Sequence, residues 1–326
     1  MMDFCVLGSG ISGATIANTL SKKYSVQVFD KARGLGGRSS NKRLKKNLSF
    51  DHGVQYINPK SKKFIKFIKK LSKKRILNTW DGNHLDFTFK KNTLAPKYIG
   101  MKANNAICKY YLKGVKLSFA SQIKKIEYKK YFWEIRLNDN SKHQFKGLIL
   151  TCPFPQLKKL ARKYLDKKIS NLKIKMQPNI TVMLALKNQI KLPISSIKFD
   201  DDILTWAANE NSKKRFKSNL NLWTLQASLK WSKKKINKYK NDKTILNQMI
   251  ARFVQLTGLE KSKIVHKKIH GWKYSYNYKK TPLLSSWDKK KQLGICGDWF
   301  SGPKVENAWL SANDLFDKVK KNPPKN

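Results

Sequence analysis

The sequence predicts an α/β protein that has a parallel sheet at its centre and a second, mixed α+β domain. A strand–helix–strand pattern occupies the first thirty residues, and such a crossover joins parallel strands. Three further strand patterns lie between residues 115 and 151, and a Lys-rich middle region alternates strand-like runs with helices. A chain of 326 residues can hold one large domain or two ordinary ones.

The first elements follow from apolar spacing. Residues 4–7 form a short apolar run that enters a glycine turn, which predicts a buried strand. Apolar residues at helical spacing predict a helix over 11–22, and residues 25–29 predict a second strand. Residues 60–75 place their apolar side chains on one helix face and Lys elsewhere, which predicts a surface helix docked on the core.

Later elements are predicted in the same way. Runs at 115–119 continuing into 123–128, at 131–137 and at 145–151 predict a small antiparallel meander. Strand-like runs at 180–186 and 222–229 lie in the middle region, which we assign mostly to the second domain. Residues 293–296 predict a strand that ends at Gly297-Asp298, and a final amphipathic helix begins near Val305.

A dinucleotide-binding fingerprint stands at the first strand–helix junction. Gly8, Gly10 and Gly13 fit the pattern G-x-G-x-x-G, and Asp30 ends the next strand twenty residues after Gly10. Gly8 permits a tight turn, Gly10 lets a pyrophosphate approach the backbone, and Gly13 lets the helix pack on the strand. The free N–H groups of the helix N-terminus attract phosphate, and Asp30 can accept hydrogen bonds from a ribose diol.

The net charge of +50 is the most unusual feature of the composition. Only 8 of the 70 basic residues are Arg, and the lysines are spread along the chain. Nucleic-acid surfaces usually use more Arg, so we interpret the charge as compositional and expect no specific nucleic-acid partner. The four cysteines form no close pair, which favours a reducing cytoplasm over a disulfide framework or a metal site. No apolar run reaches the length of a membrane span.

Other motifs carry a family resemblance. A Gly-Gly-Arg segment at 36–38 and the segment Asp51-His52-Gly53-Val54-Gln55-Tyr56 follow the fingerprint. With Gly297-Asp298-Trp299 and the helix that starts at Val305, they resemble the renalase-like branch of the flavin amine-oxidase superfamily. Similar segments continue in the expected order along nearly the whole chain.

The resemblance implies a Rossmann-type FAD-binding domain from residues 1–58, 100–160 and 275–326, and a substrate domain from 59–99 and 161–274. It implies that FAD is held by Gly8, Gly10, Ile11, Ser12, Gly13, Asp30, Lys31, Gly37, Arg38, Gln55, Tyr56, Ile123, Asp298 and Val305. Ser12 and Arg38 would touch the phosphates, and the Val305 amide would face the flavin. At Asn307 the family usually has glycine, and a side chain there crowds the ring if backbone and flavin touch.

The resemblance also implies a reaction. Renalase-type enzymes oxidise misreduced nicotinamide dinucleotides by hydride transfer to FAD and pass the electrons to O2. Candidate walls of the substrate pocket are Trp80, Trp272, Tyr274 and Trp299, and His270 is the candidate catalytic residue, at a predicted strand end. Two alternatives remain: an FAD-dependent amine oxidase or desaturase-like enzyme, and a basic nucleic-acid-binding protein on a relic FAD fold. We expect a monomer or weak oligomer.

Overall fold

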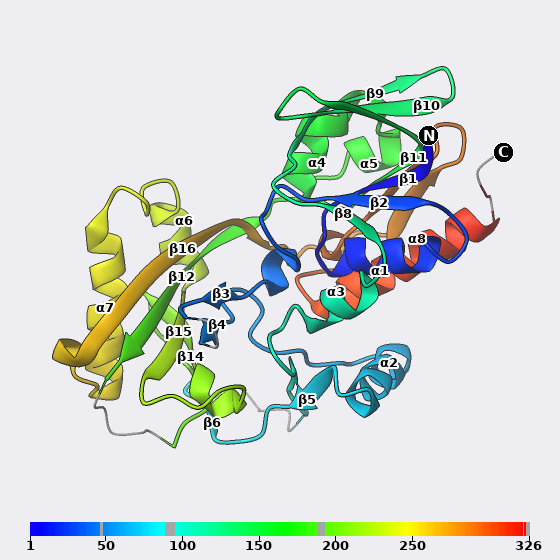
Figure 1. Cartoon of the computed structure of the whole chain (residues 1–326). Helices are drawn as coiled ribbons and strands as arrows, with labels where there is room; N and C mark the ends of the chain where they lie inside the picture. The colour runs from blue at the N-terminus through cyan, green and yellow to red at the C-terminus, as the bar shows by residue number, and fades with distance from the viewer. Residues whose placement is uncertain (46–47, 89–94, 188–192, 322, 324–326) are drawn as a thin grey trace.

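The computed structural model describes residues 1–45, 48–88, 95–187, 193–321 and 323. Figure 1 shows two lobes, each built on its own large sheet, with the strands β12 (Gln177–Leu186) and β16 (Ile264–Tyr276) reaching from one lobe toward the other. The N- and C-terminal regions lie together in the first lobe. The predicted α/β class with a Rossmann-type unit is confirmed, and its mixed second unit is present.

The first lobe contains the start and the end of the chain. Its elements are β1 (Met2–Leu7), α1 (Ile11–Leu20), β2 (Val26–Phe29), η1 (Gly37–Ser39), α2 (Lys62–Lys73), β5 (Leu77–Thr79), β7 (Tyr98–Gly100), α3 (Ala106–Tyr111), β8 (Lys116–Ser118), β9 (Ile123–Lys129), β10 (Phe132–Leu137), β11 (Lys142–Leu150), α4 (Phe154–Ala161), η2 (Arg162–Tyr164), α5 (Lys167–Ser170), β17 (Ser285–Asp288), β18 (Leu293–Cys296), η5 (Asp298–Phe300) and α8 (Val305–Lys321).

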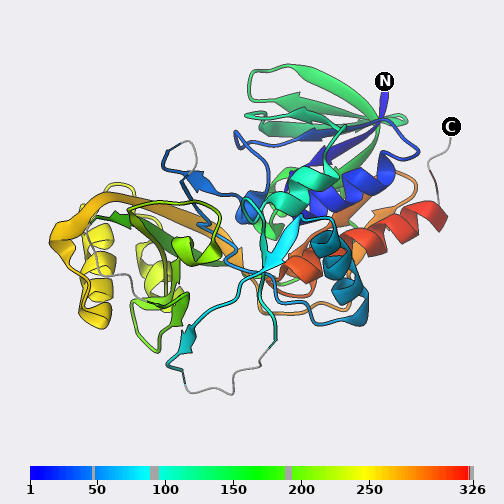
Figure 2. The same ribbon diagram turned by 60° about the horizontal axis from the view of Figure 1, so that its bottom comes forward.

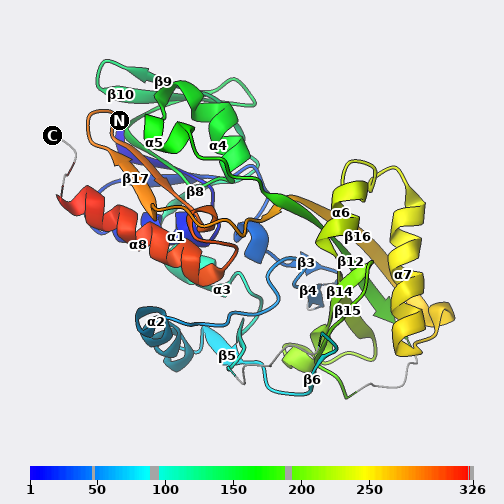
Figure 3. The same cartoon turned by 180° about the vertical axis from the view of Figure 1, so that it is seen from behind.

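The sheet of this lobe has the order β17-β18-β11-β1-β2-β8. The strands from β18 to β8 run parallel, and β17 is an antiparallel edge. Alternation along β1 sends Phe4 and Val6 to the face covered by α1, α2, α3 and α8, and Cys5 to the opposite face. Figure 3 shows α1 and α8 side by side on one face, with α4 and the β9–β10 hairpin on the other.

The meander differs in one respect from the prediction. The strands β9, β10 and β11 pair antiparallel as expected, but β8 adds to the parallel sheet beside β2. A run of three residues carries no sign of which neighbour it will pair with, so the sequence could not separate β8 from the hairpin that follows.

The second lobe is a six-stranded sheet with helices on its outer face. Its elements are β6 (His84–Asp86), β12, β13 (Ser196–Lys198), β14 (Leu204–Asn209), η3 (Glu210–Lys213), β15 (Asn221–Ala227), α6 (Leu229–Lys235), α7 (Lys243–Thr257), η4 (Lys261–Lys263) and β16. Figure 1 shows α7 outside the sheet, where Ile245, Met249 and Phe253 pack against it.

The opposite face of that sheet turns toward the first lobe. Along β15, Trp223 and Leu225 pack outward in the α7 core, so Thr224 and Gln226 point the other way. The small ribbon of β3 (Lys42–Arg43) and β4 (Ser49–Phe50) lies on this inner face, where Phe50 packs with Met183 and Leu222. The second lobe thus presents polar side chains to the space between the lobes.

Two segments differ from the predicted division into domains. Residues 62–73 form the predicted amphipathic helix α2, but the Phe64 ring packs against Trp309 of α8 with its centroid 5.4 Å away, so α2 belongs to the first lobe, as Figure 2 also shows. Likewise Ile169 of α5 packs in the core beneath the meander. In both cases the docking surface is made by residues far away in sequence.

None of the helices among the described residues combines the length and the apolar character that a membrane span needs.

Candidate functional site

One large cavity, of about 2110 Å³, is lined by residues from both lobes. It runs from the β1–α1 turn past the segments 30–43 and 52–58 to the middle of β16 and the start of α8. Pockets for single small ligands usually measure about 300–1,000 Å³. The cavity therefore has room for a dinucleotide and a second molecule.

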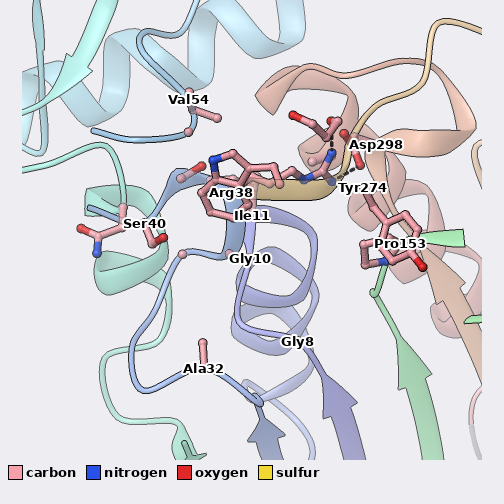
Figure 4. A pocket seen from close by; sticks show the side chains of 18 of the residues that line it. Gly8, Gly10, Ile11, Ala32, Arg38, Ser40, Val54, Pro153, Tyr274 and Asp298 are labelled. Atoms are coloured by element: carbon pink, nitrogen blue, oxygen red, sulfur yellow. Dashed lines mark hydrogen bonds and ion pairs between the residues drawn. The ribbon is translucent and has the colours of Figure 1, made fainter. Parts of the chain in front are cut away.

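The turn before α1 forms one end of the cavity. Helix α1 has no side-chain cap and no acidic residue in its first turn, so its N-terminus offers free N–H groups. Gly10, labelled in Figure 4, lines the cavity with φ of −70°, and a Cβ there would meet nothing nearer than the Gly36 carbonyl at 3.9 Å. Protein packing thus does not require glycine at position 10, whereas a ligand at the helix terminus would.

The other two fingerprint glycines are required by the protein itself. Gly8 has φ of +107°, which L side chains rarely adopt. A Cβ on Gly13 would lie 1.8 Å from the Gly8 carbonyl oxygen, so the helix can approach the strand only with glycine there. These contacts confirm the predicted turn and close packing.

Asp30 follows β2 and lines the same end of the cavity. Its Oδ2 accepts hydrogen bonds from the Ser9 N–H at 2.8 Å and the Ser9 hydroxyl at 2.6 Å, and its Oδ1 accepts from the Ala32 N–H at 2.8 Å. Asp30 therefore holds the two loops together. A carboxylate has about four acceptor positions, so one remains for a ribose hydroxyl.

Arg38 and Asp298 form an ion pair in the middle of the cavity wall. The Arg38 Nη2 lies 2.6 Å from the Asp298 Oδ1, and the Nη1 donates to the Ser275 carbonyl at 2.8 Å. Figure 4 shows the Arg38 side chain reaching across from the glycine-rich loop toward Asp298. The sequence predicted both residues as cofactor ligands but gave no sign that they pair with each other.

The start of α8 lies beside α1. The Ser12 hydroxyl donates to the Ala308 carbonyl at 3.1 Å, so the Ser12 contact available to a phosphate is its backbone N–H rather than its hydroxyl proton. Val305 lines the cavity. Asn307 does not crowd it, because its Nδ2 donates to the Ser301 and Gly302 carbonyls, both at 3.0 Å. These two hydrogen bonds hold the Asn307 amide on the loop that precedes α8.

Residues 51–56 form a loop along the cavity, which we call the inner loop. Gln55 and Tyr56 line the cavity, and the Val54 N–H donates to the Arg38 carbonyl at 2.9 Å. The Gln55 Oε1 is buried without a hydrogen-bond partner among the described residues. A buried acceptor without a partner indicates a group that a bound molecule can satisfy.

Three rings gather where the inner loop meets β16. The His52 ring centroid lies 4.7 Å from that of His270 and 5.0 Å from that of Trp272, and the His270 and Trp272 centroids lie 4.4 Å apart. Burial, then the neighbouring His270, lowers the pKa of His52 to about 3, and burial and Lys42 lower the pKa of His270 to about 4. Both imidazoles are therefore neutral at pH 7.

The predicted substrate walls divide into two pairs. Trp272 and Tyr274 line the cavity, as does His270, which lies within β16 rather than at a strand end. Trp80 and Trp299 do not line it. Trp80 is buried behind Tyr56 and donates to the Ser212 hydroxyl at 2.9 Å, and Trp299 stacks on Phe300 in the core. These two tryptophans are core residues, and their prediction as pocket walls is wrong.

Two remaining predicted ligands lie at the first end of the cavity. Lys31 follows Asp30, and Ile123 begins β9 with its side chain largely buried. The sequence prediction missed other lining residues of the second lobe, above all Gln226, Trp206 and Tyr276. The only signal for them was the alternation of polar residues along β15 and β16, which shows a polar face without showing what it borders.

Comparisons with known proteins agree with this geometry. A family model described as an NAD(P)-binding Rossmann-like domain matches residues 6–71. Renalase of Mus musculus is 28% identical over 167 residues, which are 48% of this chain and 48% of that protein. The matched segment thus spans about half the length of this curated relative.

Solved structures share the fold over nearly the whole chain. One is described as a protoporphyrinogen oxidase from Exiguobacterium sp. 255-15, with a TM-score of 0.75, 9% identity and 98% coverage of both chains. A triple mutant of putrescine oxidase has a TM-score of 0.71 at 8% identity, covering 98% of this chain and 99% of that one. The chain is therefore similar to renalase over about half of its length, and over nearly its whole length it has the fold of these two oxidases.

The residues present fit FAD, the cofactor that the resemblance implies. The uncapped helix terminus and the open space above Gly10 suit a pyrophosphate, and Asp30 keeps an acceptor for ribose. The cavity continues to Gln55 of the inner loop, whose Oε1 has no hydrogen-bond partner among the described residues, so one continuous space could hold a flavin dinucleotide.

Proposed function

We propose that this protein is an FAD-dependent oxidoreductase that takes a hydride from a small or dinucleotide donor. The donor class we favour is the misreduced dihydronicotinamide isomers of NAD(P)H, with O2 as the acceptor that reoxidises the flavin. The observation that carries the proposal is one continuous cavity, which extends from the uncapped N-terminus of α1 to a group of aromatic and imidazole rings.

The side chains divide the work between holding and orienting. The α1 N-terminus and Arg38 would hold the cofactor phosphates, and Asp298 fixes the direction of the Arg38 fork. Bound FAD supplies the two-electron acceptor. Trp272 and Tyr274 would flank a planar donor, and the second lobe would shield it from water.

His270 would orient the donor and not transfer a proton. Its low pKa keeps the imidazole neutral at pH 7, so it can donate one hydrogen bond and accept another, as a carboxamide requires. A dihydropyridine donor needs no base, because loss of hydride leaves a stable aromatic cation. The absence of charge on the two histidines therefore suits this donor.

The charge of the cavity favours an anionic donor over an amine. Among the described residues that line it, twelve are Lys or Arg and three are Asp or Glu. The FAD pyrophosphate would neutralise only part of that excess, and an ammonium group would be repelled. An amine oxidase or desaturase-like activity is the second candidate, because the same fold serves several chemistries.

The proposal also covers the cellular compartment, the oligomeric state and the partners of the enzyme. The four cysteines, Cys5, Cys108, Cys152 and Cys296, are free, which favours a reducing cytoplasm. We propose a monomer or weak oligomer that has no specific nucleic-acid partner.

An anaerobic titration tests the function. The FAD-loaded protein is mixed without oxygen with each dihydronicotinamide isomer, with ordinary NADH and with a set of amines, while the flavin absorbance is recorded. We expect rapid bleaching by the misreduced isomers and slow bleaching by NADH. Bleaching by amines alone would favour the second candidate, and a bound flavin that none of them bleaches would refute the proposed donor class.

A further inference from the structure

Four charged side chains are buried together behind the inner loop, outside the cavity. We call Asp51, Glu210, Lys213 and Arg215 the buried ion network. The Lys213 Nζ lies 2.9 Å from both the Asp51 Oδ2 and the Glu210 Oε2, and Arg215 Nη1 donates to the same Asp51 oxygen. None of the four side chains is more than 5% exposed.

The network is electrically balanced. It holds two carboxylates and two cations, and the Glu210 Oε1 also accepts from the Thr224 hydroxyl at 2.6 Å and the Asp51 N–H at 3.2 Å. Although burial acts in the opposite direction, Arg215 and Lys213 lower the pKa of Asp51 to about 2, whereas at Glu210 burial outweighs the same two cations and raises the pKa of the carboxyl. Removing one partner would leave a buried charge without compensation, which is costly.

The network connects the two lobes through the inner loop. Asp51 opens that loop, whereas Glu210 and Lys213 belong to η3 of the second lobe. Arg215 Nη2 also donates to the Asn104 Oδ1 at 2.9 Å, and the Asn104 Nδ2 donates to the Val54 and Gln55 carbonyls at 2.7 and 2.9 Å.

A second connection comes from β15. The Gln226 Nε2 donates to the Gly53 carbonyl at 2.7 Å, two residues along the strand from Thr224. The backbone of the inner loop is thus fixed at Asp51, Gly53, Val54 and Gln55, while its cavity side presents His52, Gln55 and Tyr56.

We propose that the buried ion network positions the inner loop, so that the second lobe sets the environment of the flavin although none of the four charged residues lines the cavity. The proposal rests on the function proposed above, because it needs FAD in the cavity. The four residues are positioning residues, since they act through His52, Gln55 and Tyr56.

The central variant is Glu210→Gln, which keeps the shape of the side chain and removes one charge. Two readouts are used: hydrogen exchange of peptides covering residues 48–58, and the visible circular dichroism of bound FAD. We expect hydrogen exchange in this segment to be at least about 10-fold faster than in the protein without substitutions, because the inner loop loses a group that fixes it. We also expect an altered flavin spectrum, because a displacement of about 1 Å of the residues around a bound molecule is enough to change a site. Anaerobic flavin reduction should slow by about 10- to 100-fold.

Asp201→Asn is the matched control. Asp201 is also a carboxylate of the second lobe, with a side chain that is 7% exposed, and it pairs with Arg252 at 2.6 Å but does not line the cavity or touch the inner loop. It should leave exchange over residues 48–58 and the flavin spectrum unchanged. In the double variant Glu210→Gln with Lys213→Met, the balanced Asp51–Arg215 pair remains, so exchange should return toward the original rate.

The outcomes separate this proposal from the proposed function. If the protein without substitutions does not bind FAD, the proposed function is overturned. Hydrogen exchange over residues 48–58 still tests whether the buried ion network positions the inner loop. The positioning role is overturned if Glu210→Gln has the same exchange over residues 48–58 and the same flavin spectrum as the protein without substitutions. It is also overturned if exchange becomes faster evenly over both lobes. If Glu210→Gln fails to fold, Arg215→Lys serves instead, because it keeps the charge and loses only the fork that reaches Asn104.

Discussion

Alanine at Gly10 should separate cofactor binding from folding. In the protein, the new Cβ would lie 3.9 Å from its nearest neighbour, and φ of −70° suits any residue. A Gly→Ala change at a compatible site stabilises by about 0.4–1 kcal/mol, and Ala is a poorer N-cap than Gly by a similar amount. The free energy of unfolding of the apoprotein should therefore change by less than about 1 kcal/mol.

Binding of FAD should respond differently. The methyl group occupies the space through which a phosphate reaches the helix N–H groups, and we expect FAD affinity to fall by at least about 100-fold, or roughly 2.7 kcal/mol. Thermal unfolding with and without excess FAD measures both effects, because a ligand at 100 times its Kd stabilises by about 2.7 kcal/mol.

Gly13→Ala is the comparison. Its Cβ would lie 1.8 Å from the Gly8 carbonyl oxygen, so the apoprotein itself should lose several kcal/mol. If Gly10→Ala shows the same rise in Tm with FAD as the unchanged protein, then the cofactor does not pass over Gly10, and the site is assigned wrongly.

Three further predictions concern charge. Because the pKa of His52 is lowered to about 3 and that of His270 to about 4, the unfolded chain binds protons between about pH 6.5 and 4 while the folded protein does not. The free energy of unfolding, measured with urea, should therefore fall by a few kcal/mol at most as the pH drops through this window, and it should fall less in His270→Asn. An equal dependence of the unfolding free energy on pH in the two proteins would contradict the neutral imidazoles. Arg38→Lys keeps the charge but loses one arm of the fork, so FAD should be lost about 10- to 100-fold faster on desalting, and unchanged retention would remove Arg38 from the site. Retention of FAD should change little between 50 and 200 mM salt, whereas a nucleic-acid binder would lose affinity by about 10³-fold or more over that range.

The first lobe could be predicted well because its signals are local. The fingerprint glycines, the strands beside them and the amphipathic α8 all follow from residues close in sequence. The edge strand β16 was not predicted as a whole. Its sequence alternates Lys with apolar residues, a pattern that does not distinguish a strand from a solvent-exposed segment.

The part of the site that lies between the inner loop and the second lobe depends on contacts between residues that are distant in sequence. Trp80 was expected in the pocket because aromatic residues suit a planar ligand, but a Trp is equally suited to a core, and only the fold places Tyr56 in front of it. The buried ion network joins Asp51 to side chains about 160 positions later, and no local pattern marks such a pair.

The most direct test of the account is the visible spectrum of the protein after incubation with FAD and desalting. The account predicts a yellow protein with about one flavin per chain and a spectrum distinct from that of free FAD. A colourless protein that does not retain FAD, although folded by circular dichroism, would contradict the central claim that the cavity is a flavin site.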